Sequence, residues 1–87
     1  MNLNQPNRKP SKQILQLVAV NIRRKREEKG WVPKQLAGIC GCPLSVVYRL
    51  EQGSPRNSIA LATLEIFSRA LGCETWELIA PTSEHPK

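Results

Sequence analysis

The chain has 87 residues, which is enough for one small domain with a single hydrophobic core. Apolar residues make up 40% of it and charged residues 23%, a composition typical of globular proteins and not of disordered chains. The formal charge is +6, no apolar run is long enough to span a bilayer, and no hydrophobic segment follows the polar residues 1–10. We therefore expect neither a membrane protein nor a secretory signal.

The charge is unevenly distributed along the chain. Most of the basic side chains lie in residues 1–30, whereas acidic side chains outnumber basic ones after residue 57. A basic surface of this kind could bind nucleic acid, an anionic membrane or an acidic protein. Charge alone does not distinguish among these partners.

In chain order, residues 1–11 come first; they are rich in Asn, Gln, Pro and basic side chains and predict a flexible basic arm. Residues 12–80 are expected to form the folded domain, and residues 81–87 a flexible tail. Within the domain, apolar side chains recur at helical spacing, and no stretch shows convincing strand alternation. A glycine or proline stands at the end of each helical stretch. The expected helices cover residues 11–29, 33–41, 43–52, 59–71 and 74–80.

Residues 33–52 meet the demands of two helices joined by a tight turn. Such a unit needs apolar residues toward the core, a small residue where the helices approach most closely, and a turn residue that tolerates positive φ. Ala37 is the small residue and Gly41 the turn residue. The apolar positions are occupied by Leu36, Cys40, Cys42, Val47 and Leu50. This spacing predicts a helix-turn-helix motif.

A family resemblance covers about residues 18–79 and rests on four stretches and one glycine. These are Ile22–Gly30, Gln35–Ala37, Gly41, Tyr48–Gly53 and Arg69–Cys73. In them the chain resembles the Cro/C1-type, XRE-like helix-turn-helix regulators. The resemblance implies an all-α, compact five-helix domain of the lambda-repressor type, whose third helix enters the major groove of DNA. It also implies binding as a dimer to an inverted repeat, and a role in transcriptional control.

The same resemblance implies an ion pair between Arg26 and Glu51, which would tie the first helix to the end of the third. A guanidinium can donate two parallel hydrogen bonds to one carboxylate, which suits a partly buried pair. The alternative is two solvated surface charges, whose interaction is worth under about 1 kcal/mol.

The helix expected at residues 43–52 would carry the groove-reading side chains. Because Val47 and Leu50 face the core, we expect Leu44, Ser45, Tyr48 and Arg49 to point away from it, with Val46 near the boundary. The resemblance places the base-reading positions at Leu44, Ser45, Val46 and Arg49. Arg49 could donate two hydrogen bonds to guanine, and a phosphate contact is the alternative. Since Leu44 and Val46 offer only apolar contacts, DNA shape and half-site spacing are expected to contribute to specificity.

Contacts to the DNA backbone are assigned to other residues. Lys34 lies in the first turn of the second helix, where free backbone N–H groups and the helix dipole favour a phosphate. Further backbone contacts are expected from Tyr48, Arg56 and Asn57. Arg8, Lys9 and Lys12 could add contacts from the N-terminal arm, although ordinary solubility explains these charges about as well.

The three cysteines, Cys40, Cys42 and Cys73, fall on apolar positions of the resemblance and are interpreted as small buried hydrophobic residues. They lack His or acidic partners at ligand spacing, so neither a metal nor a cofactor is expected. Their odd number favours a reducing cytoplasm. Trp76 and Ile79, on the last short helix, form a candidate dimer interface because aromatic residues are enriched at interfaces.

The sequence thus predicts a transcriptional regulator that binds an inverted repeat in double-stranded DNA as a homodimer, most simply as a repressor of its own operon. No nucleophile–base pair or phosphate-cradling glycine loop indicates an enzyme. The alternative is a protein-interaction module, or an antitoxin-type protein, that uses the same fold to bind a protein partner.

Overall fold

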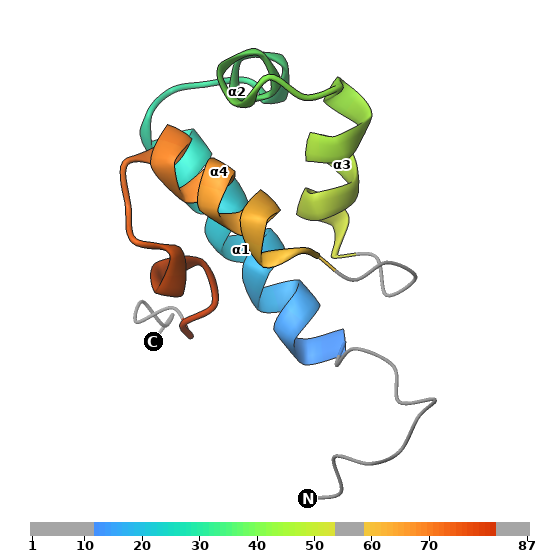
Figure 1. The fold of residues 1–87 in the computed structure, drawn as a ribbon, viewed down its shortest axis with the longest axis vertical. Helices are drawn as coiled ribbons and strands as arrows, with labels where there is room; N and C mark the ends of the chain where they lie inside the picture. Colours follow the sequence, from blue (N-terminus) through green and yellow to red (C-terminus); the bar gives the residue numbers. More distant parts are fainter. Residues whose placement is uncertain (1–11, 54–58, 82–87) are drawn as a thin grey trace, which may run out of the picture.

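The computed structural model describes residues 12–53 and 59–81, and within these ranges all regular structure is helical. The elements are α1 (Lys12–Glu28), α2 (Pro33–Cys40), α3 (Leu44–Gln52), α4 (Leu61–Leu71) and a single 3-10 turn, η1 (Thr75–Leu78) (Figure 1). The prediction of an all-α domain with five helical elements is confirmed. The predicted arm (residues 1–11), the loop at 54–57 and residues 82–87 lie outside the described ranges.

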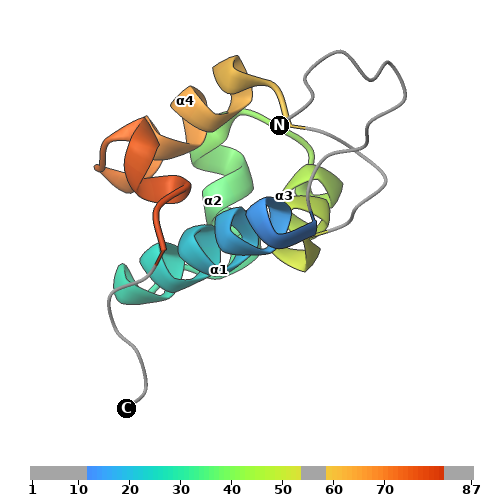
Figure 2. The same ribbon diagram turned by 90° about the horizontal axis from the view of Figure 1, so that it is seen from below.

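The helix α1 is the element around which the others are arranged. It packs against α3, α4 and η1, while α2 packs against α3 and α4. In Figures 1 and 2, α3 and η1 lie on opposite sides of the domain, with α1 and α4 between them. The two ends of the fold are therefore connected through the helices that lie between them, α1 and α4.

The core draws apolar side chains from every helical element. The predicted stripe of α1, which includes Leu15, Val18 and Ile22, is buried. The largest apolar side chains that are fully enclosed are Phe67, Ile22, Leu36, Leu78 and Val47. Trp31 and the three cysteines are half-buried and pack around this cluster, so the cysteines occupy apolar surroundings as expected.

Two glycines shape the ends of the helices that flank the central turn. Gly41 ends α2 with a φ of 72°, and the N–H of Cys42 then donates to the carbonyl of Ala37 at 3.0 Å. Gly53 ends α3 with a φ of 64° and is buried against α1, where an added Cβ would lie 3.4 Å from Cα of Gln16. A side chain at residue 53 would therefore be strained by the positive φ and would have little spare room against α1.

Two predicted elements differ from the structure by two residues or more at one end, whereas the other three agree within one residue at each end. The fourth helix begins at Leu61 and not at residue 59, because Ile59 and Ala60 form its extended entry. The last element is one 3-10 turn of 4 residues rather than a helix over residues 74–80. No helix in the described ranges is both long enough and apolar enough to cross a membrane.

Candidate nucleic-acid interface

The outward face of α3 is a continuous polar stripe. Val47 and Leu50 are buried in the core, and they fix which side of the helix faces away from it. The exposed side chains recur at i, i+3, i+4 and i+7, the spacing of one helical face, and are Ser45, Tyr48, Arg49 and Gln52. The sequence analysis did not assign a role to Gln52, although its i+7 relation to Ser45 was a usable signal.

Leu44, one of the predicted base-reading residues, is less available than expected, whereas Val46 lies at the boundary of the core as predicted. Leu44 was predicted to point away from the core, but it is half-buried and packs against the core cluster. The reason is its position one turn before Val47 on the same side of the helix. Val46 was predicted near the boundary, and it too is half-buried against the core.

Arg26 and Glu51, for which an ion pair was expected, form a two-point contact between α1 and α3. Nε of Arg26 lies 2.7 Å from Oε2 of Glu51, and a second guanidinium nitrogen lies 3.0 Å from Oε1. Their side chains are only 9% and 10% exposed. The hydrogen bond that Arg26 donates to Glu51 is the main cause that raises the pKa of Arg26 above its ordinary value.

The same guanidinium also holds the loop after α1. Its remaining terminal nitrogen donates to the backbone carbonyl of Trp31 at 2.6 Å. One buried side chain thus joins α1, the start of the helix-turn-helix unit and the end of α3. This arrangement fixes the orientation in which the outward stripe of α3 is presented.

The N-terminus of α2 offers fewer backbone donors than the sequence analysis assumed. Pro33 has no N–H group, and the N–H of Val32 donates to Oε1 of Gln35 at 2.9 Å. Lys34 is exposed beside this end and forms no ion pair with another described residue. A phosphate at this point would therefore interact chiefly with the Lys34 side chain.

Several residues with predicted DNA contacts cannot be placed. Arg8 and Lys9, in the arm, and Arg56 and Asn57, before α4, lie outside the described ranges. Lys12 begins α1, but its side chain is not among those described. The described part of the interface is therefore α3 together with the start of α2.

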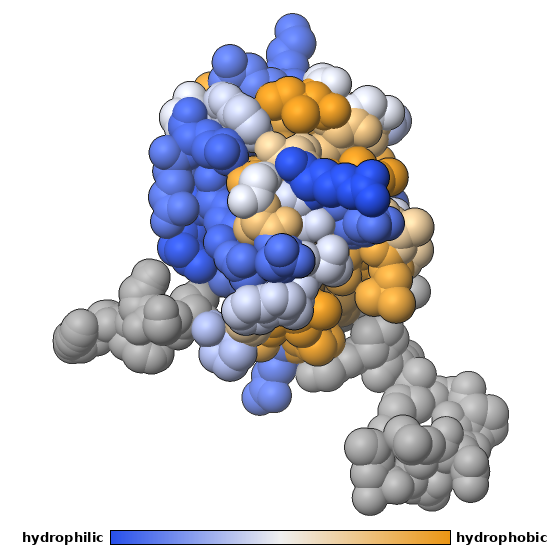
Figure 3. Space-filling view, turned by 60° about the vertical axis from the view of Figure 1, so that its left-hand side comes forward, coloured by the Kyte–Doolittle hydropathy of each residue, from blue (hydrophilic) through white to orange (hydrophobic). Residues whose placement is uncertain are grey.

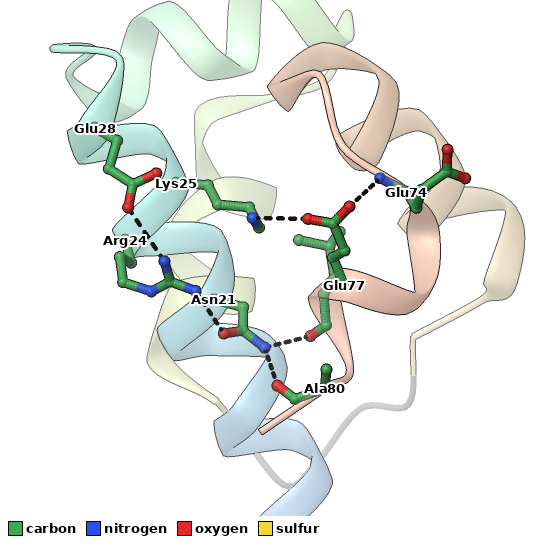
Figure 4. A network of polar contacts seen from close by, with 8 residues as sticks. Asn21, Arg24, Lys25, Glu28, Glu74, Glu77 and Ala80 are labelled. Atoms are coloured by element: carbon green, nitrogen blue, oxygen red, sulfur yellow. Dashed lines mark hydrogen bonds and ion pairs between the residues drawn. The ribbon is translucent and has the colours of Figure 1, made fainter. Parts of the chain in front are cut away.

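Asn21 is a buried polar residue that the sequence analysis did not single out, and it lies on the side of α1 that faces η1. Asn21 is fully buried, and its Nδ2 donates to the backbone carbonyls of Leu78 at 3.0 Å and Ala80 at 2.8 Å. Figure 4 shows this contact beside an ion pair between Lys25 and Glu77. The sequence around Asn21 contains no signal that distinguishes a buried asparagine, bonded to distant carbonyls, from one that is exposed to solvent.

The two predicted dimer-interface residues differ in exposure. Trp76 is 65% exposed, whereas Ile79 is half-buried and packs against the core. Figure 3, which turns the left-hand side of Figure 1 forward, shows hydrophilic residues along the left edge and across the middle of this face, with separate apolar patches between them.

The cysteines lie in surroundings that favour the neutral thiol. Burial raises the pKa of Cys40 to about 11, with a smaller contribution from Cys42, and burial also raises the pKa values of Cys42 and Cys73. Within residues 12–53 and 59–81, no three His, Cys, Asp or Glu side chains are grouped so that they could hold a metal ion. The candidate site is therefore the outward face of α3, together with the Arg26–Glu51 pair that holds it in place.

Comparison with known proteins gives a consistent assignment. A helix-turn-helix family model matches residues 22–78. A hypothetical transcription factor from Neisseria meningitidis serogroup B is 36% identical over 86 residues, which cover 98% of this chain and 79% of the relative.

Solved structures give the same result at the level of the fold. The crystal structure of a hypothetical transcription factor from Neisseria has a TM-score of 0.74 at 33% identity, over 92% of this chain and 91% of that one. The restriction-modification controller protein C.AhdI from Aeromonas hydrophila has a TM-score of 0.67 at 28% identity, over 74% of this chain and 94% of its own. All of these similar proteins are described as regulators of transcription or as a controller protein, and none as an enzyme.

Proposed function

Because the chain belongs to the XRE-like helix-turn-helix family of DNA-binding transcription factors, we propose that it binds an inverted repeat in duplex DNA as a homodimer and acts as a repressor. In this proposal α3 lies in the major groove. The observation that carries the proposal is the outward stripe of α3, held in place by the buried Arg26–Glu51 pair.

Within the stripe, Arg49 is the principal base-reading residue. It is exposed and forms no ion pair with another described residue, so its guanidinium is available for a ligand. Two of its donors match O6 and N7 of guanine, a contact worth about 1–3 kcal/mol of discrimination. Ser45, one turn earlier, can donate to or accept from a neighbouring base. Leu44 and Val46 contribute apolar contacts only through their exposed parts.

The backbone contacts surround this reading face. Lys34 at the start of α2 and Tyr48 and Gln52 on α3 are exposed and bind phosphate or sugar. Arg56 and Asn57, in the loop before α4, and Arg8, Lys9 and Lys12, in and beside the arm, extend these contacts. These residues set the register of the domain on the duplex without specifying its sequence.

The proposed dimer forms through the end of the fold that carries Trp76. This side chain is 65% exposed, and Figures 1 and 2 place its turn on the side of the domain away from α3. Two copies joined there hold their α3 helices far apart, as half-sites about 34 Å apart along the duplex require. Binding at a site that overlaps a promoter then excludes the polymerase.

The test is a selection of binding sites from random duplexes with the wild-type protein and with Arg49→Ala. We expect the wild type to recover an inverted repeat, and Arg49→Ala to lose preference at one base pair in each half-site. The control is Arg69→Ala, which removes an exposed arginine that is paired with Glu65 on α4, away from the reading face. It should recover the wild-type sites.

Two outcomes would contradict the proposal. Identical sites for the wild type and Arg49→Ala would show that Arg49 does not read a base. A wild-type protein that recovers no enriched sequence at low salt would contradict sequence-specific DNA binding, and the alternative of a protein partner would replace it.

A further inference from the structure

The first turn of α3 presents few hydrogen-bonding side chains. Recognition helices contact base edges chiefly through their N-terminal residues. In α3 these residues are Leu44, Ser45 and Val46, and the exposed Pro43 precedes them as a cap without a side-chain hydrogen bond. Among these four side chains, only that of Ser45 can donate or accept a hydrogen bond. The surface that this turn offers to a ligand is therefore mainly apolar.

Val46 lies on the edge of the reading face that also carries Arg49. Residues three and four apart are neighbours on a helix, so the next turn places Val46 beside the exposed Arg49 and the buried Leu50. The side chain of Val46 is accordingly half-buried, and part of it packs against the core cluster. Leu44 has the corresponding place on the other edge, beside Tyr48. A group that contacts Val46 therefore lies next to the group that Arg49 binds.

The exposed part of Val46 is held in a defined position. Its backbone N–H donates to the carbonyl of Pro43 at 3.0 Å and closes the first turn of the helix. A β-branched side chain in a helix has one strongly preferred χ1 rotamer. A contact with Val46 consequently costs little side-chain entropy.

One group in the major groove suits such a surface. The base edges there carry nitrogen and oxygen donors and acceptors, and the apolar group among them is the methyl group at C5 of thymine. An apolar side chain over a donor or acceptor would displace water without replacing its hydrogen bond. A methyl group in contact with Val46 loses only its unfavourable exposure to water. 5-Methylcytosine carries the same methyl group at the same position of the ring.

We propose that Val46 is a specificity-determining residue that recognises a pyrimidine methylated at C5, and that this base adjoins the guanine read by Arg49. The inference rests on the proposed function, because it takes α3 to lie in the major groove. It adds the chemical class of a second base in each half-site. It also makes methylation of a cytosine at this position a modification that strengthens binding.

The test uses the duplex recovered by site selection, in which Arg49→Ala identifies the guanine pair of each half-site. Each thymine beside that pair is replaced with deoxyuridine, which removes the methyl group and leaves every hydrogen-bonding atom in place. We expect the affinity, measured by fluorescence anisotropy, to fall about fourfold for each half-site, as the loss of one buried methyl group implies. Replacement of the same T·A pair with C·G should also weaken binding, and 5-methylcytosine in place of that cytosine should recover about fourfold.

Variants assign the effect to Val46. Val46→Ser removes both methyl groups of the side chain, and the preference for thymine over deoxyuridine should fall below twofold. Val46→Ala should reduce the preference in the same direction, and it decides the question if Val46→Ser does not fold. Arg49→Ala should lose the preference for guanine but retain the preference for thymine over deoxyuridine. The matched control is Ile66→Ala, which truncates an apolar side chain that is 49% exposed on α4 and should bind like the wild type.

The outcomes separate this inference from the proposed function. If deoxyuridine binds as tightly as thymine, or if no thymine adjoins the guanine pair in the recovered site, the inference fails and the DNA-binding regulator stands. If the methyl effect is undiminished in both Val46 variants, another residue recognises the methyl group and the inference also fails. If site selection enriches no sequence, or if Arg49→Ala recovers the wild-type sites, the inference fails together with that part of the proposed function.

Discussion

At the scale of single residues, Glu51 gives the sharpest prediction of stability. Glu51→Gln leaves the guanidinium of Arg26, whose side chain is 9% exposed, without its charged partner in the interior. We expect the free energy of unfolding to fall by about 3–5 kcal/mol, because an uncompensated buried charge is far more costly than a missing surface pair. Urea denaturation monitored by circular dichroism measures this change.

The matched control for this prediction is Glu65→Gln. It breaks a pair with Arg69 in which the side chains are 55% and 77% exposed, so the expected loss is under about 1 kcal/mol. The double variant Arg26→Met/Glu51→Leu should lose less stability than Glu51→Gln, because no charge is then buried. Equal losses for Glu51→Gln and Glu65→Gln would refute the buried-pair interpretation.

The sequence predicted burial correctly at positions where the residue type and the helical spacing indicate the same environment. Val47 and Leu50 are apolar at core spacing, and both are buried. Leu44 was expected to face away from the core, although its position one turn before the buried Val47 puts it on the side that packs inward. Asn21 was missed because its partners are backbone carbonyls more than 50 residues away, which no local pattern encodes.

At the scale of the helices, the two glycines of α2 should respond in opposite ways to the same substitution. Gly38 lies inside α2 with nothing within 4 Å of an added Cβ, so Gly38→Ala should stabilise the protein by about 0.5–1 kcal/mol. Gly41→Ala should destabilise it by about 1–2 kcal/mol, because its φ of 72° is unfavourable for a residue with a Cβ. Thermal unfolding followed by circular dichroism compares the two variants. A loss of stability in Gly38→Ala would indicate a close neighbour that the structure does not contain.

The helices themselves were largely predictable because each end has a local cause. Pro33 begins α2, and glycines with positive φ end the helices at residues 30, 41, 53 and 72. The last element was predicted as a helix because residues 74–80 contain no internal breaker. The structure has a single 3-10 turn there, which packs against both α1 and α4. Its long-range contacts, such as those of Asn21 and Lys25, are not encoded in the local sequence.

At the scale of the whole molecule, the net charge of +6 bears on how binding responds to salt. If the domain neutralises six phosphates, the logarithm of the association constant should fall with the logarithm of the salt concentration with a slope of about −5. Lys34→Ala should reduce the magnitude of this slope by about 1 and weaken binding similarly for all sequences, because Lys34 is proposed to contact phosphate only. Fluorescence anisotropy with the selected duplex across a salt series measures both quantities.

The salt experiment also distinguishes the roles of two basic side chains. Arg49→Ala should weaken binding to the selected sequence far more than binding to an unrelated duplex, whereas Lys34→Ala should affect both duplexes equally. A sequence-dependent loss in Lys34→Ala would contradict its assignment to the backbone.

The fold as a whole was predictable from the order of its elements and from the family resemblance. The sequence could not show how the side of the domain that carries η1 is connected to the side that carries α3. That relation depends on neighbouring residues of α1, Asn21, Lys25 and Arg26, which face different partners at long range. Their pattern in the sequence is only that of a charged helix.

The division of α3 into a buried side and a polar stripe has a consequence for how such a protein can diversify. Ser45, Tyr48, Arg49 and Gln52 are all exposed, so exchanging them alters no packing in the interior. If α3 reads DNA as proposed, new target sequences can arise through a handful of substitutions, while the framework that keeps the domain folded is inherited intact.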